Sequence, residues 1–139
     1  MPDTPLPLTE HRRPPAAPDA AQEAEVAAVI SSFYRRVKED PLLAPVFEAH
    51  VTEWDPHLAT MHDFWMSVVY RVGRYAGNPL RVHRALGGLR PEHFRRWLAL
   101  WEQTVRETAT PGVAPTLIAD AQRMGAAMSA RLAADRGDA

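Results

Sequence analysis

Residues 78–88 read NPLRVHRALGG. This stretch predicts a short helix, because it has a start signal at one end and a stop signal at the other. Asn78 can cap the exposed amides of a first turn, and Pro79 suits the first helical position. The glycines that close the segment stop a helix, because glycine readily leaves the right-handed helical conformation. We therefore expect a helix of about two turns between Asn78 and Gly88.

His83 is the polar exception on the inner face of this short helix. Leu80, His83 and Leu86 recur every three residues and therefore share one face, so His83 is predicted to point inward. Arg81 and Arg84 point to the side or away. An inward imidazole is either a core side chain hydrogen-bonded to a carbonyl or a ligand for a metal or cofactor. The helix alone leaves both readings open.

The composition limits the classes of protein that the chain can represent. With 139 residues, 46% of them hydrophobic, it is long enough for one domain with a real core. A net charge of -1 and the lack of a Lys/Arg stripe predict that neither nucleic acid nor an anionic membrane is a partner. The absence of cysteine excludes disulfides, iron–sulfur clusters and thiolate catalysis. We see no signal-peptide core and no membrane-length apolar run, so we expect a cytoplasmic protein.

The N-terminal segment differs in character from the rest of the chain. Six of the 13 prolines lie within residues 1–18, mixed with polar residues and without periodicity. Such composition favours a disordered tail, whose role the sequence does not indicate. We therefore place one domain at residues 19–135.

Helical periodicity dominates this domain. The predicted helices run from a cap at Asp19 to about residue 40, from a cap at Asp55 with Pro56 in the first position to about residue 72, over 91–108, and from near Pro115 onward. Residues 41–50 are predicted to pack as short turns. No segment alternates long enough to form a strand, so the fold is expected to be all-α, with four substantial helices and at least one short one.

The six histidines do not have the spacing of a bare metal site. His57 and His62 are five residues apart, and no His-Glu-x-x-His motif is present. We expect His11 and His50 to be solvated, His62 to face outward and His93 to lie at the rim of the core. His57 and His83 remain as the two inward candidates.

These two histidines lie on separate predicted helices, which fits a haem held between them. Haem needs one imidazole on the iron, a second polar group near the open face, and large apolar walls. Aromatic side chains at helical spacing can supply those walls, although such a stripe is also what an ordinary core contains. The hydroxyl of Tyr34 and the indole N–H of Trp97 each need an acceptor when buried, and a bound dioxygen would provide one.

Several short motifs, in order along the chain, resemble the truncated haemoglobins, and most closely their group III branch. The resemblance covers about residues 25–132. It rests on the following residues: Phe33-Tyr34, Pro45-Val46-Phe47, Trp54, His57, Phe64-Trp65, Gly77-Asn78-Pro79, His83, Phe94 and the run from Trp97 to Trp101.

This resemblance implies a globin-like two-over-two helical sandwich that binds haem b (iron protoporphyrin IX). On this mapping His83 looks like the proximal iron ligand, and Tyr34, His57 and Trp97 look like the distal ligand-binding residues, with His57 at the gate. The expected haem-contacting residues are His83, Phe47, Met61, Phe64, Trp65, Leu80 and Trp97.

The resulting functional hypothesis is a globin that reversibly binds dioxygen, nitric oxide or carbon monoxide at a His-ligated iron. Hydrogen bonds from Tyr34 and Trp97 would hold oxygen tightly, which suits nitric oxide oxidation or peroxide handling, with an unidentified reductase, better than bulk oxygen delivery. Arg81, Arg84 or Arg90 would pair with the haem propionates. The rival hypothesis is a cofactor-free helical interaction module. An enzyme with an organic substrate has little support, because no acid–base pair or nucleophile accompanies the pocket.

Overall fold

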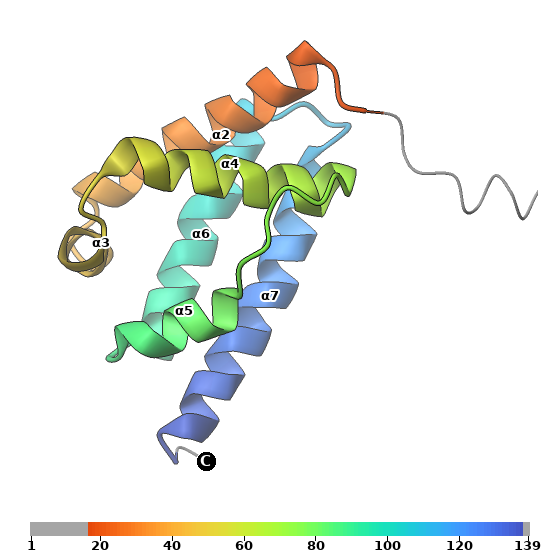
Figure 1. Ribbon diagram of the computed structural model, residues 1–139. Helices are drawn as coiled ribbons and strands as arrows, with labels where there is room; N and C mark the ends of the chain where they lie inside the picture. The colour runs from red at the N-terminus through yellow and green to blue at the C-terminus, as the bar shows by residue number, and fades with distance from the viewer. Residues whose placement is uncertain (1–16, 138–139) are drawn as a thin grey trace, which may run out of the picture.

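The computed structural model describes residues 17–137, and every regular element in that range is an α-helix (Figure 1). The predicted tail, residues 1–18, lies almost wholly outside the described residues. The helices are α2 (Ala20–Glu39), α3 (Ala44–His50), α4 (Trp54–Tyr70), α5 (Pro79–Leu86), α6 (Pro91–Thr108) and α7 (Ala114–Asp135).

The four long helices form two layers. One layer contains α2 and α4, the other contains α6 and α7, and α2 packs against both α4 and α6 (Figure 1). The short helix α5 lies apart from α2 and α4, across the lower part of α6 and α7. The predicted all-α, two-over-two architecture is confirmed. Within residues 17–137, no helix is long and apolar enough to cross a membrane.

The core is centred on aromatic side chains where the two layers meet. Phe33 on α2 is fully buried, and its ring packs edge-to-face on Trp101 at 5.0 Å and on Trp97 at 5.4 Å. Trp101 stacks in turn on Trp65 of α4 at 4.5 Å. Its indole N–H donates to the Leu117 carbonyl at 3.0 Å, so the one polar atom of this side chain is satisfied. This cluster therefore joins all four long helices.

Local signals set most helix ends as predicted. Asp19 caps α2 by accepting the Gln22 N–H at 2.8 Å, and α2 ends before Pro41. Asn78 caps α5 by accepting the Arg81 N–H at 3.1 Å. In each case a side-chain oxygen satisfies an amide that has no partner within the helix.

Two predicted segments differ from the structure. Residues 41–50 are more ordered than the expected turns, because α3 forms over seven of them with Pro45 in its first turn. The helix α4 begins at Trp54, so the predicted cap at Asp55 is wrong; Pro56 is tolerated because first-turn amides have no intrahelical partner. It ends at Tyr70, two residues early, because Arg71 adopts the left-handed conformation (φ 56°).

Candidate cofactor pocket

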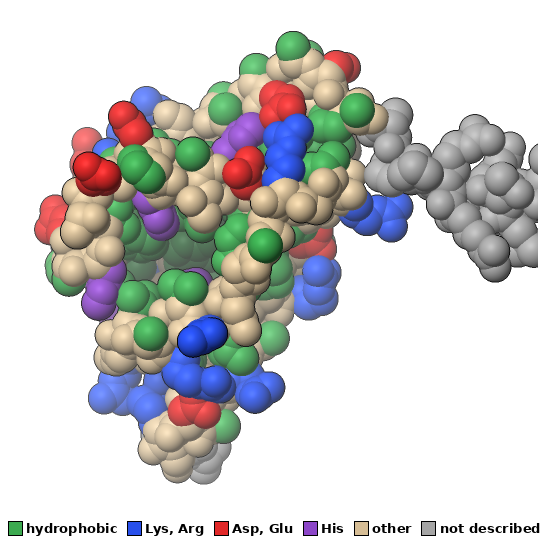
Figure 2. All heavy atoms as spheres, viewed as in Figure 1, with side chains coloured by type: hydrophobic (Ala, Val, Ile, Leu, Met, Phe, Trp, Pro, Cys, Tyr) green, Lys and Arg blue, Asp and Glu red, His purple; other side chains and the backbone are tan. Residues whose placement is uncertain are grey.

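A cavity of about 540 Å³ opens between α4 and α5, next to α3, with α6 and α7 behind it. Figure 2 shows it as a hollow in the face of the molecule whose interior is mainly hydrophobic. Its volume is in the range of small-molecule and cofactor sites. All nine residues predicted for the haem site line this one cavity. They are Tyr34, Phe47, His57, Met61, Phe64, Trp65, Leu80, His83 and Trp97.

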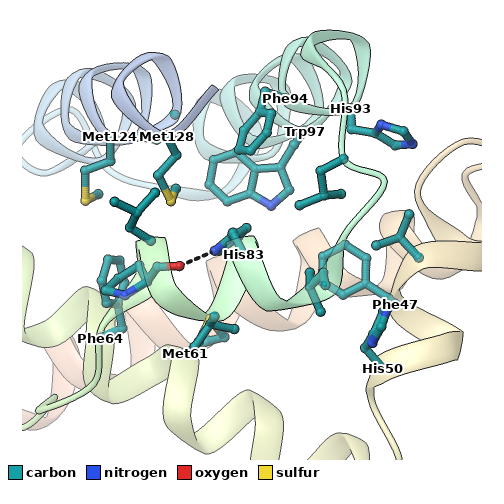
Figure 3. Close-up of a pocket in the computed structure, with 18 of the residues that line it drawn as sticks. Phe47, His50, Met61, Phe64, His83, His93, Phe94, Trp97, Met124 and Met128 are labelled. Atoms are coloured by element: carbon teal, nitrogen blue, oxygen red, sulfur yellow. Dashed lines mark hydrogen bonds between the residues drawn. The ribbon is translucent and has the colours of Figure 1, made fainter. Parts of the chain in front are cut away.

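His83 lies in the wall that α5 contributes, as the close-up shows (Figure 3). Its Nδ1 is 2.6 Å from the carbonyl oxygen of Pro79, one turn earlier in the same helix. A carbonyl only accepts, so this contact assigns the proton to Nδ1 and leaves the lone pair on Nε2. A backbone carbonyl on the other ring nitrogen is the usual partner of an imidazole that binds a metal. The same contact also satisfies the carbonyl bond expected for a core histidine, but only at one nitrogen.

Tyr34 reaches the cavity from α2 and is only 5% exposed. Among residues 17–137, no side chain or backbone group forms a hydrogen bond with its hydroxyl. Burial raises the pKa of this hydroxyl well above its ordinary value, so the group stays protonated and can donate. A buried hydroxyl of this kind is available to a polar ligand in the cavity.

His57 on α4 stands among aromatic rings at the same end of the cavity. Its ring lies 5.1 Å from Tyr34, 5.7 Å from Trp54 and 6.2 Å from Phe47, each edge-to-face. Burial lowers the pKa of His57, which favours the neutral imidazole. Its Nε2 is buried without a partner among the described residues. A buried polar atom without a hydrogen-bond partner, beside an apolar cavity, indicates that the cavity binds a ligand.

Trp97 on α6 lies above His83 in Figure 3. Its ring is nearly parallel to that of Trp101, at 5.6 Å and 5°, so the core fixes its orientation. No residue of the described chain accepts a hydrogen bond from its indole N–H. Tyr34, His57 and Trp97 thus bring three unpartnered polar groups to one apolar cavity.

Three other histidines differ from expectation or line the cavity unexpectedly. His50 is exposed as predicted, yet it lines the cavity, and so does His93. His62 was predicted to face outward, which is wrong. Its Nε2 lies 3.2 Å from the Glu23 carbonyl oxygen, because α2 covers that side of α4. The described residues contain no group of three or more His, Cys, Asp or Glu side chains suited to a bare metal ion.

The arginine at the cavity is a different one from those proposed on sequence. Arg131 of α7 lines it, whereas Arg81, Arg84 and Arg90 do not. Arg84 instead donates to the Asp135 carboxylate at 2.6 Å, away from the opening. Arg131 lies on the last third of α7, where no local pattern links it to a site formed by α4 and α5.

Tyr75 is a wall residue that sequence reasoning missed. It belongs to the irregular segment between α4 and α5, and its ring meets Phe64 edge-to-face at 5.0 Å. A glycine at position 77 makes room for this ring, because a Cβ there would collide with it. The aromatic residue next to a Gly-Asn-Pro turn is the one signal that could have pointed to it.

The arrangement as a whole fits a flat, apolar cofactor with a metal at its centre. One wall offers an imidazole whose Nε2 is free of hydrogen bonds within the described chain, and other walls offer Tyr34, Trp97 and His57. Such a site can hold an iron porphyrin through one axial bond and large apolar surfaces.

Comparison with known proteins supports the same family. No model of a protein family matches the chain. A group 3 truncated haemoglobin of Campylobacter jejuni is 30% identical over 91 residues, which is 63% of this chain and 72% of that protein. The crystal structure of a group III truncated haemoglobin from Campylobacter jejuni superposes with a TM-score of 0.76 at 25% identity, covering 84% of this chain and 95% of that one. With the two-over-two fold and the histidine-bearing pocket, this relationship makes the chain a member of the group III truncated haemoglobins.

Proposed function

We propose that the chain binds haem b in the cavity between α4 and α5, that His83 would hold the iron, and that a diatomic gas would bind near Tyr34, Trp97 and His57. The observation that carries the proposal is the single hydrogen bond of His83. Its Nδ1 is used by Pro79, so its Nε2 is left for a metal in a cavity that also contains Tyr34, Trp97 and His57. When bound, haem would supply the iron to which dioxygen, nitric oxide or carbon monoxide could bind.

The distal residues would act as hydrogen-bond donors to that gas ligand. Tyr34 is protonated at neutral pH, because its pKa is raised by burial, and the Trp97 N–H is always a donor. Hydrogen bonds to a partly charged ligand contribute about 1.5–3 kcal/mol each, enough to slow its release by about one to two decades. We therefore favour retention of the ligand for chemistry, such as nitric oxide oxidation or peroxide handling, over bulk oxygen delivery. Such turnover would also require a reductase.

His57 would govern access to the distal side. It is neutral and half-buried among Tyr34, Trp54 and Phe47, so it closes this end of the cavity without bringing a charge into it. Outward rotation of its ring would open a path for the ligand, and inward rotation would bring Nε2 to the iron as an alternative ligand.

The apolar walls would hold the porphyrin by contact. Met61, Phe64 and Trp65 line the cavity from α4, Phe47 from α3 and Leu80 from α5. His50, His93 and Arg131 are the polar side chains of its lining with which propionates would pair.

The direct test is titration of the purified protein with haem. We expect one haem per chain, a Soret band distinct from that of free haem, and a carbon monoxide complex after reduction. The rival, a cofactor-free interaction module, predicts protein that stays colourless and a titration that shows only non-saturating association. That second result would overturn the proposal.

A further inference from the structure

The helix that carries His83 is poorly anchored by its own packing. None of its eight residues, Pro79–Leu86, is buried, and Val82 is 53% exposed. The segment leading to it, residues 71–78, has no regular structure. Leu86 packs against the cluster that contains Leu89 and Phe94, but hydrophobic contact fixes the position of α5 less than it fixes the long helices, so polar contacts contribute more to where the imidazole lies.

Two polar contacts hold this region. The Arg84–Asp135 ion pair joins α5 to α7 at 2.6 Å. A second cluster, which we call the α4–α5 latch, is formed by Ser67, Glu23 and Arg74 and holds the segment that leads into α5. The Ser67 hydroxyl accepts the backbone N–H groups of Arg74 at 2.9 Å and Tyr75 at 3.0 Å. It also donates to the Asp63 carbonyl at 2.7 Å, which orients its lone pairs toward the segment. One hydroxyl thus ties the backbone of the segment to the last turn of α4.

An ion pair also attaches this segment to α2. Arg74 donates to both carboxylate oxygens of Glu23, at 2.8 and 2.7 Å, the two-pronged geometry that best orients a guanidinium. This hydrogen bond, with the charge of Arg74, lowers the pKa of Glu23, and the same pairing raises that of Arg74. His62 approaches Glu23 from α4, with 3.7 Å between its Nε2 and the carboxylate. The segment is therefore attached to both α2 and α4.

The latch reaches His83 through a short and continuous path. Tyr75, whose N–H is held by Ser67, packs on Phe64 and over the glycine at position 77. Two residues after that glycine, the carbonyl of Pro79 accepts the His83 Nδ1 proton. A shift of the segment would therefore carry both a cavity wall and the partner that orients the imidazole.

We propose that Ser67, Glu23 and Arg74 are positioning residues, which set the place of His83 in the cavity although they lie outside the cavity lining. This inference rests on the proposed haem function, since the position of His83 is measured by its bond to the iron. It goes further, because it assigns the placement of the proposed iron ligand to a contact at the C-terminal end of α4.

The experiment compares Ser67→Ala, Ser67→Thr and Glu23→Gln in the haem-loaded full chain. The readouts are the iron–histidine stretching band in the ferrous, ligand-free resonance Raman spectrum and the rate of haem loss to an acceptor globin. Matched controls are Ser32→Ala, which removes a serine hydroxyl bonded to an arginine on α2, and Glu102→Gln, which breaks an ion pair on α6.

We expect Ser67→Ala and Glu23→Gln to shift or broaden the iron–histidine band and to speed haem loss by about two- to tenfold, the effect of one or two net hydrogen bonds. Ser67→Thr keeps the hydroxyl and should restore the wild-type band, and both controls should match wild type. Glu23→Gln also tests the latch if Ser67→Ala does not fold.

Haem-loaded variants with an unchanged band and an unchanged loss rate would overturn the positioning role. A Ser67→Thr protein that behaves like Ser67→Ala would do the same, because the effect would then not depend on the hydroxyl. A wild-type protein that fails to bind haem would instead contradict the proposed function, so the two failures are distinguishable.

Discussion

The two sides of the cavity are built on different principles. The side formed by α2, α4 and α6 is continuous with the core, and Tyr34, Trp65 and Trp97 all pack on fully buried aromatic rings. The side formed by α5 has no buried residue. It is held by the partial packing of Leu86 and by polar contacts, namely the Asn78 cap, the His83–Pro79 contact, the Arg84–Asp135 ion pair and the α4–α5 latch. The first side therefore gives fixed geometry to Tyr34 and Trp97, the proposed distal donors. The second leaves His83, the proposed iron ligand, adjustable by small polar changes.

The largest expected effect is a loss of global stability when a residue on the side formed by α2, α4 and α6 is changed. Trp101→Ala removes a buried ring that stacks on two others, together with the indole N–H that donates to the Leu117 carbonyl. We expect the free energy of unfolding to fall by about 3–5 kcal/mol in urea denaturation. Val82→Ala on α5, at an exposed side chain, should change it by less than about 0.5 kcal/mol. Equal losses would remove the distinction between the two sides.

The distal donors should affect ligand release more than folding. Tyr34→Phe and Trp97→Phe each delete a donor, and we expect each to speed oxygen dissociation by about ten- to a hundredfold in stopped-flow measurements. The Tyr34→Phe ring keeps its contacts with Phe33 and Phe47, so unfolding midpoints should change little. Unchanged dissociation rates would contradict the hydrogen-bonding role.

Side-chain caps at the starts of α2 and α5 test the comparison, since one lies on each side of the cavity. Asn78→Ala removes the cap of α5, and Asp19→Ala removes that of α2; each change costs about 1 kcal/mol of local helix stability. We expect Asp19→Ala to lower the global free energy of unfolding. Asn78→Ala should instead leave global unfolding nearly unchanged and weaken haem affinity by roughly fivefold. The reverse pattern would show that α5 belongs to the cooperative core.

The smallest expected effect is a pH dependence from His57. Burial lowers the pKa of His57 below its ordinary 6.5, so the unfolded chain binds this proton at a higher pH than the folded chain does. The contribution of His57 to stability is therefore present above pH 6.5 and is lost as the pH falls through the lower folded-state pKa. We expect urea denaturation above and below pH 6.5 to show a smaller acid-induced loss for His57→Leu than for wild type. Parallel losses in the two proteins would refute a buried neutral His57.

Much of this molecule could be predicted from sequence because the relevant signals are local. The caps at Asp19 and Asn78, the prolines at helix starts and the apolar stripes gave the helices, and the order of short motifs pointed to the family. The nine predicted site residues line one cavity. Helical spacing marks the inner face of a helix, and the resemblance to the truncated haemoglobins selected the site residues.

The features missed depend on contacts between distant segments or with an irregular one. Glu23 and Arg74 are 51 positions apart, and the role of Ser67 depends on backbone amides in an irregular segment, so neither has a periodic signal. His62 was assigned to the surface because its position was judged against the stripe of α4 alone, whereas α2 covers a second side of that helix. Arg131 was missed for the same reason, since only the packing of α7 brings it to the cavity.

The most direct test of the central claim is the absorption spectrum of His83→Gly with and without added imidazole. If His83 Nε2 is the axial ligand, haem in the variant should lose the wild-type ferric and ferrous spectra, and imidazole entering the vacated space should restore them. A His83→Gly protein that keeps the wild-type spectrum and haem affinity without imidazole would contradict the account, because the iron would then be held by another residue.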